Sequence, residues 1–308
     1  MAIVPNAQDC ASDRLNLGMP SCLAELKDYK GFIAVPKNWS LGIADDTFDL
    51  DYVVGQIQQG NFIPFLGANE FVDNTPDPTN KEFTSGITMV IRNGLPTYQF
   101  EFNKEYAFHK AASSFNSFRQ YDILIVDSVG NIFAAENTDG TEIEGFKGGM
   151  INTRTFRPND GGAELAKTLV DIQLINERQY NRKGVVLTAS SNGFSALDDL
   201  FAIMDVTIDG AAEAGGDLVF KVKSVANPAF DVEGALADNF RLTVDGVAAI
   251  IDSVSYNEST YEYSLTPDTP FVSNEELVLE FYDSVESINV ANIDNMLIKG
   301  SSGTITVS

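Results

Sequence analysis

Residues 87–103 read Ile-Thr-Met-Val-Ile-Arg-Asn-Gly-Leu-Pro-Thr-Tyr-Gln-Phe-Glu-Phe-Asn. Apolar side chains occupy alternate positions on both sides of Asn93-Gly94, and a period of two is typical of strands with one face turned inward. Asn-Gly supplies the positive φ angles that a tight turn requires. The stretch therefore predicts a β-hairpin with its turn at Asn93-Gly94.

Turn signals of the same kind recur beside other β-type stretches. A chain that turns so often is predicted to be mainly antiparallel β. The further dipeptides are Asp139-Gly140, Asp160-Gly161, Asn192-Gly193, Asp209-Gly210 and Asp245-Gly246.

Residues 1–204 are predicted to form one β-rich α+β domain with an N-terminal arm. A helix is expected over 104–118, because its apolar residues fall on one side. The Pro-containing stretch 73–80 is expected to be an exposed loop. Strands are expected over 121–126, 132–135, 148–156 and 169–174.

Two further helices are expected in the first 60 residues. Ser21 is predicted to cap a helix that ends at Gly31, and Thr47 to cap a helix that ends at Gly60.

Residues 205–308 are predicted to form a separate Ig-like β-sandwich. Apolar and polar residues alternate over 218–223, 240–245, 261–265 and 277–281, and about seven short strands are expected. From Val206 onward the chain carries 17 acidic and 4 basic residues. This higher density of negative charge supports a second module.

The whole chain has a formal net charge of −24. Such a surface repels the phosphate backbone, so adhesive binding of nucleic acid is not expected. The charge fits a secreted protein, a calcium-loaded protein, or a surface past which DNA slides without sticking. Solubility alone is an equally good explanation.

The only cysteines are Cys10 and Cys22, and both free thiols and one disulfide bond remain open. The first residues contain no basic n-region or apolar h-region, so no secretory leader is predicted. No apolar run is long enough to span a membrane, and a membrane partner is therefore not expected.

No catalytic constellation stands out, and the chain is not predicted to be an enzyme. His109 is the only histidine, without a Gly-x-Ser-x-Gly elbow, which favours a structural role. The segment Gly145–Gly149 lacks the spacing of a phosphate loop. No catalytic, cofactor or metal residue is therefore assigned, and calcium binding by the dispersed acids of the second domain stays open. The acids Asp45, Asp46, Asp49 and Asp51 favour the first turn of a helix over a cation site.

Two parts of the chain carry a family resemblance. Tyr98–Ala111 (YQFEFNKEYAFHKA) and Phe118–Ile132 (FRQYDILIVDSVGNI) resemble structural proteins of tailed phages of Bacteroidetes-type hosts, including the crAss-like group. Asn239–Ala248 (NFRLTVDGVA) and Leu277–Asp283 (LVLEFYD) are similar to bacterial Ig-like repeats.

The resemblance implies a virion subunit, assembled in the host cytoplasm, of the tail-tube or neck-ring type. Its first domain is then a tail-tube-like sandwich or barrel, and its Ig-like domain faces outward. Its partners are copies of itself in a ring or tube, other tail, neck or capsid proteins, and DNA in transient, non-adhesive passage. Residues 1–20 and the 73–80 loop are candidates for reaching adjacent subunits.

Two other functions remain open at this stage. The Ig-like domain is a candidate for decorating a capsid or for binding host-surface glycans. A virion-borne polysaccharide hydrolase is disfavoured, because such enzymes usually line their clefts with several tryptophans and this chain contains only Trp39.

Overall fold

The computed structural model describes residues 3–5, 28–43, 48–159, 165–213, 215–285, 287–293 and 296–308. Both cysteines, the helix expected after Ser21, and the turn at Asp160-Gly161 lie outside these ranges. The chain is mainly β, as predicted, and it divides into two compact units. One unit contains residues 1–56 and 60–200, and the other contains residues 57–59 and 201–308.

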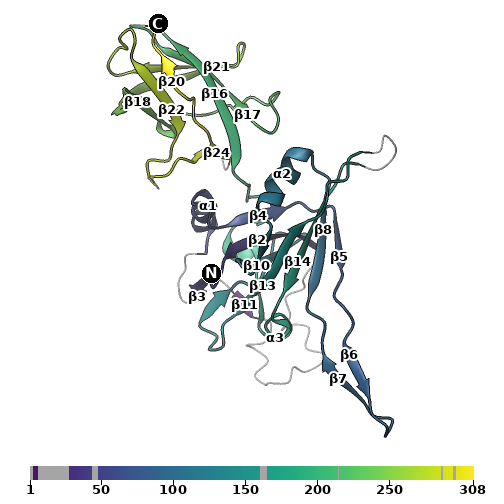
Figure 1. Ribbon diagram of the computed structural model, residues 1–308. Helices are drawn as coiled ribbons and strands as arrows, with labels where there is room; N and C mark the ends of the chain where they lie inside the picture. Colours follow the sequence, from purple (N-terminus) through teal and green to yellow (C-terminus); the bar gives the residue numbers. More distant parts are fainter. Residues whose placement is uncertain are drawn as a thin grey trace. The chain divides into compact units, whose positions relative to one another are not determined.

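The first unit is built on a large antiparallel sheet (Figure 1). Several of its strands are unbroken apolar runs, which is typical of strands that are buried on both faces. The main strand order is β1 (Ile3–Pro5), β15 (Gly184–Leu187), β11 (Ile132–Glu136), β10 (Tyr121–Asp127), β2 (Tyr29–Pro36) and β4 (Ile63–Leu66). Beside this order, β12 (Glu142–Glu144) pairs with β11 and with β3 (Ser40–Gly42).

A second antiparallel sheet packs against the first. Tyr98, Phe100 and Phe102 alternate with partly exposed polar residues along one of its strands, so one face is apolar, as the period of two predicts. Its strand order is β5 (Glu70–Asp73), β8 (Thr97–Phe102), β14 (Thr168–Leu174), β13 (Gly148–Thr153) and β9 (Ser117–Phe118).

The main core of the first unit lies between these two sheets. Phe32 of β2 and Phe100 of β8 are completely buried, with their ring centroids 5.4 Å apart. The same cluster includes Ile125 of β10 and Ile172 of β14. On the other face of the large sheet, Ile33 is completely buried as well. The large sheet is therefore covered on both faces.

The described helices of the first unit are short. The helix expected over 104–118 is present as α2 (Tyr106–Ser114), shorter because Ser117 and Phe118 belong to β9. The first turn of α1 (Leu50–Gln58) is capped by the Asp49 side chain, which accepts a hydrogen bond from the Tyr52 N–H at 2.9 Å. Two further helices are α3 (Glu177–Arg182) and α4 (Ala189–Asn192).

Two predicted helix boundaries have different outcomes. Gly60 follows the end of α1 with a φ of 75°, as predicted, whereas Thr47 lies outside the described residues. The prediction that Gly31 ends a helix is wrong, because Gly31 lies within β2. A Cβ at Gly31 would stand 2.2 Å from the Phe65 carbonyl oxygen, so glycine permits the close approach of β4.

The predicted hairpin over 87–103 is also wrong. The strand β7 (Thr88–Arg92) pairs with β6 (Thr79–Glu82), whereas β8 pairs with β5 and β14. The turn between β6 and β7 is closed by a hydrogen bond from the Phe83 N–H to the Ile87 carbonyl at 2.9 Å, with Gly86 at a φ of 77°. The expected 73–80 loop is accordingly shorter, because Asp73 lies in β5 and Thr79 in β6.

The other turn signals separate into three groups. Gly140 and the pair Asp245-Gly246 have positive φ angles and connect neighbouring strands, as predicted. Gly193 instead ends α4. Asp209-Gly210 lies inside a strand, where a Cβ at Gly210 would stand 2.7 Å from the Cβ of Phe220. A dipeptide of this kind therefore marks a close backbone approach as well as a turn.

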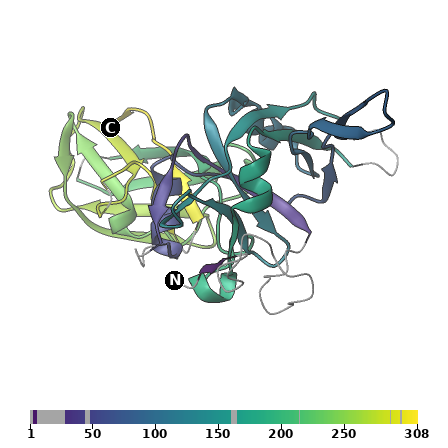
Figure 2. The same ribbon diagram turned by 90° about the horizontal axis from the view of Figure 1, so that it is seen from below.

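The second unit is a β-sandwich, as predicted (Figure 2). Phe220, Phe240, Tyr263 and Phe281 are among the buried residues of its core. One sheet has the order β20 (Ile251–Asn257), β21 (Glu262–Pro267), β17 (Leu218–Ser224), β16 (Met204–Ala212), β24 (Met296–Lys299) and β23 (Ala291–Ile293). The other has the order β19 (Val247–Ala249), β18 (Phe240–Val244), β22 (Glu276–Phe281) and β25 (Ile305–Thr306), and η2 (Ala237–Asn239) precedes β18.

Phe100→Ala is expected to destabilise the first unit by about 3–5 kcal/mol, because it leaves a cavity between the two sheets. Urea unfolding followed by the fluorescence of Trp39 measures this, since the only tryptophan belongs to the first unit. The exposed Val129→Ala is the control and should change the free energy of unfolding by less than about 0.5 kcal/mol. Equal effects of the two substitutions would contradict this account of the core.

Candidate assembly surface

Several exposed apolar residues of the first unit lie together on a projecting hairpin, β6–β7, which we call the arm (residues 79–92). Figure 1 shows it extending beyond the ends of β5 and β8. Every residue of its two strands is exposed. Its two strands form a sheet of their own, which no third described strand joins.

The arm holds an apolar strand in solvent. The exposed fractions of Ile87, Met89, Val90 and Ile91 are 65%, 51%, 54% and 57%. Ile87 and Met89 share one face, since they are two residues apart, and Ile91 lies at a register shift between the pairs Asn80–Val90 and Thr79–Arg92. An isolated two-stranded hairpin is marginally stable in water, and open apolar strands tend to pair with other chains. The arm thus has the properties of a surface that is covered by a partner.

The base of the arm is fixed to the body of the unit. The ladder of β5 and β8 continues through a hydrogen bond from the Asn74 N–H to the Thr97 carbonyl at 2.8 Å. Gly94 lies against the neighbouring segment, where a Cβ would stand 1.9 Å from the Pro76 carbonyl oxygen. Gly94 therefore brings the two connections together, whereas the sequence predicted a turn there. The arm is a directed projection from the sheet.

The arm also differs in charge from the rest of the chain. It carries Lys81 and Arg92 against the single acid Glu82, which gives a net charge of +1. The whole chain has a net charge of −24. Opposite charge steers two surfaces toward each other and disfavours wrong partners.

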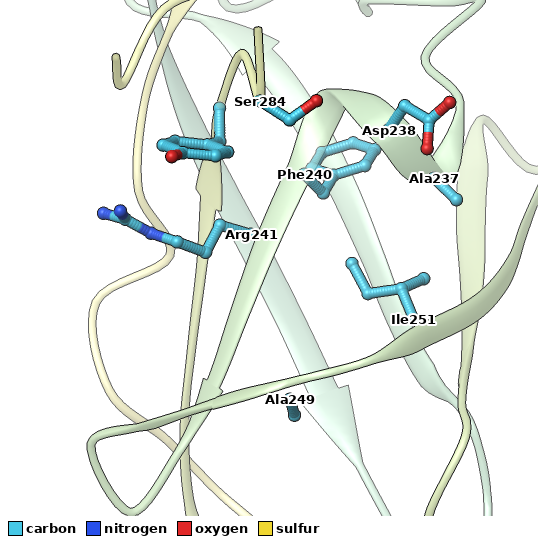
Figure 3. Close-up of a pocket in the computed structure, with 8 residues that line it drawn as sticks. Ala237, Asp238, Phe240, Arg241, Ala249, Ile251 and Ser284 are labelled. Carbon is cyan, nitrogen blue, oxygen red and sulfur yellow. The ribbon is translucent and has the colours of Figure 1, made fainter. Parts of the chain in front are cut away.

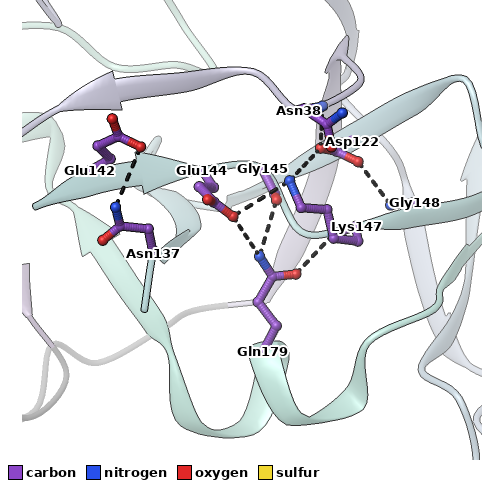
Figure 4. A network of polar contacts seen from close by, with 9 residues as sticks. All are labelled: Asn38, Asp122, Asn137, Glu142, Glu144, Gly145, Lys147, Gly148 and Gln179. Atoms are coloured by element: carbon purple, nitrogen blue, oxygen red, sulfur yellow. Dashed lines mark hydrogen bonds and ion pairs between the residues drawn. The ribbon is translucent and has the colours of Figure 1, made fainter. Parts of the chain in front are cut away.

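A polar network lies beside the sheets of the same unit (Figure 4). The buried Asp122 carboxylate accepts hydrogen bonds from the Lys147 ammonium group at 2.9 Å and from the Asn38 N–H at 2.9 Å. Gln179 donates to Glu144 at 3.3 Å and accepts from the Lys147 N–H at 2.9 Å. Because these groups satisfy one another, the network holds β10, β12 and α3 together.

A shallow pocket of about 250 Å³ lies in the second unit (Figure 3). Arg241 lies over the Tyr282 ring, with its guanidinium carbon 4.6 Å from the ring centroid. The same guanidinium is paired with Glu280 and donates to the Asn289 side chain at 3.0 Å. The cationic group and the aromatic face that a ligand would use are thus already engaged within the protein.

The structure places the residues considered for chemistry in packing roles. The Nδ1 of His109 is 3.5 Å from the Thr168 hydroxyl, and its ring lies against Tyr106 and Phe156. Gly148, in the glycine-rich segment 145–149, packs so closely that a Cβ would stand 2.2 Å from a backbone oxygen.

Possible cation ligands do not converge in the described part of the chain. Asp49 caps α1 and Asp51 lies in its first turn, whereas Asp45 and Asp46 fall outside the described ranges. Among the described residues, no group of three or more histidine, cysteine or acidic side chains is arranged to hold a metal ion.

Sequence reasoning missed a cluster of tyrosines at one end of the core. The hydroxyls of Tyr29 and Tyr180 are 2.8 Å apart, and the Tyr98 ring packs against both residues. Burial is the main cause that raises the pKa of Tyr29 and of Tyr98 well above the ordinary value. These residues come from distant segments, so no local motif signals the cluster.

A comparison of the chain with models of known protein families gives no match, and neither does a comparison with curated protein sequences. Among the described residues, no helix is long and apolar enough to cross a membrane. Neither comparison bears on the function, which leaves the geometry of the described residues and the resemblance in the sequence as its basis.

The stability of the first unit should fall as the pH rises above about 10. The pKa values of Tyr29 and Tyr98 are higher in the folded state than the ordinary value of 10.0. The stabilisation that comes from these two protonated hydroxyls is therefore fully present below that pH. Above that pH, these tyrosines lose their protons in the unfolded chain before they do so in the folded unit. The free energy of unfolding then falls by up to about 1.4 kcal/mol per pH unit for each tyrosine. Urea unfolding between about pH 9 and 11.5, followed by Trp39 fluorescence, measures the slope. Tyr29→Phe should reduce this slope, and an unchanged slope would contradict the raised pKa of Tyr29.

Proposed function

We propose that the protein is a structural subunit of a tailed-phage virion, a tail-tube, neck-ring or related tail component that assembles with copies of itself into rings. The observation that carries the proposal is the arm. It exposes an apolar strand on a fixed base, and this arrangement is stable in water when a partner covers it. A ring subunit presents such a surface to its neighbour.

The charge of the chain supports the same function. DNA carries one negative charge per roughly 1.7 Å of its axis, so a channel with an acidic wall does not retain it. A chain of net charge −24 has enough acidic groups for such a wall. In this proposal DNA passes through the ring without a specific contact.

The second unit serves in this proposal as an outward appendage of the ring. Its core is complete within the unit, as expected for an independently folded module. Capsid decoration or glycan binding by this unit is the alternative. The pocket at Arg241 offers it less support than the arm offers self-assembly, because the polar groups there are paired with one another.

The purified protein is expected to form rings or tubes that negative-stain electron microscopy detects. Replacing Ile87, Met89 and Ile91 together with serine should abolish them, because these exposed apolar side chains of the arm are lost. The melting temperature should stay within about 2 °C, since substitutions of exposed residues change stability little.

The control replaces Val247 and Ile250 with serine, because these apolar residues are even more exposed than those of the arm but lie in the second unit. This variant should still assemble. Loss of assembly in both variants would show that the effect comes from a general loss of apolar surface and is not specific to the arm. A wild-type protein that remains monomeric at high concentration would exclude self-assembly.

A further inference from the structure

The free edge of β7 offers backbone groups for pairing. Phe83 and Ile87 close the arm as a hydrogen-bonded pair, and Lys81 and Met89 are the next such pair in the register. Hydrogen-bonded and non-hydrogen-bonded pairs alternate in an antiparallel ladder. The N–H and C=O groups of Thr88 and Val90 therefore point away from β6, into solvent.

A second open edge lies on β5, the outermost described strand of the smaller sheet. The hydrogen bond from the Asn74 N–H to the Thr97 carbonyl identifies these two as a hydrogen-bonded pair. It therefore determines which residue pairs along β5 and β8 are hydrogen-bonded and which are not. It turns the backbone N–H and C=O groups of Phe71 and Asp73 outward, away from β8. This edge contains no proline, and it carries the exposed acids Glu70 and Asp73.

The other described edges of the first unit's two main sheets are less suited to receive a strand. The β4 edge contains Pro64, which has no N–H to donate. The strand β9 has only two residues, β3 has three, and β1 has three and includes Pro5. The strand β5 has four residues, close to the five of β7.

We propose that β7 of one copy adds to the free edge of β5 in a second copy and so extends the five-stranded sheet across the subunit boundary. This inference rests on the proposed self-assembly and specifies its contact. Arg92 at the end of β7 would lie beside the neighbour's acidic edge, which carries Glu70 and Asp73, and Lys81 on β6 adds to the positive charge of the arm. This charge complementarity favours a second copy over another partner.

The contact is heterologous, since the arm and the β5 edge are different surfaces of the same chain. Each copy gives one arm and receives another. A contact of this type produces a ring when the rotation closes and a filament when it does not. A contact between two arms would instead produce only a symmetric dimer.

Val90→Pro tests the arm side of this contact. Proline removes the outward N–H at position 90 and leaves the ladder with β6 intact, because that N–H is not part of it. Val90→Ala is the matched control, since it shortens the side chain and keeps the N–H. Sedimentation velocity should show self-association of Val90→Pro to be at least about tenfold weaker than that of Val90→Ala. Equal association of the two variants would overturn strand addition.

Glu70→Lys with Asp73→Lys tests the edge side. Lysines on an edge strand block pairing and repel the basic arm. The matched control is Glu258→Lys with Asp268→Lys, which makes the same change in charge at exposed positions of the second unit. The first double variant should be monomeric, and the control should still assemble.

An equimolar mixture completes the test. Val90→Pro retains a competent β5 edge, and Glu70→Lys with Asp73→Lys retains a competent arm, so the mixture should form a one-to-one dimer that neither variant forms alone. A mixture that stays monomeric would overturn the pairing of arm with β5. Monomeric wild-type protein would overturn the proposed function itself, and matching melting temperatures establish that every variant is folded.

Discussion

The first unit depends on a large sheet that is buried on both faces. Phe32 and Ile33 are neighbours in β2 and point to opposite sides, yet both are completely covered. The large sheet therefore has no free face for a partner, whereas the outer face of the smaller sheet carries partly exposed polar residues such as Gln99 and Glu101. The open β5 edge belongs to the smaller sheet, and the arm is a separate two-stranded sheet connected to β5 and β8.

The arm combines exposed apolar residues with charged ones. Open apolar strands are a hazard that proteins usually blunt with charge, proline or short length. Here Lys81, Glu82 and Arg92 flank the apolar residues, and the close contact of Gly94 with Pro76 sets the direction of the projection. Charge at the two ends and apolar residues between them restrict the surfaces that the arm can match.

The polar clusters of the protein have structural roles in this arrangement. Asp122 is buried and satisfied by Lys147 and by backbone donors, which makes the charge part of the scaffold. Arg241 in the second unit is engaged in the same way by Glu280. Among the described residues, these charged groups are thus used inside the fold, whereas the apolar residues of the arm are exposed.

Residue patterns alone were enough to predict the fold class, ten of the 25 described strands and the β-sandwich over the last hundred residues, because period two and apolar runs depend on local burial. It did not determine which strands pair. Both halves of residues 87–103 are strands, but periodicity records the face of a side chain and says nothing of the neighbouring backbone. The tertiary structure alone decided that Gly94 serves a close contact, that Tyr29, Tyr98 and Tyr180 meet, and that the apolar residues of β7 are exposed, since each depends on segments distant in the chain.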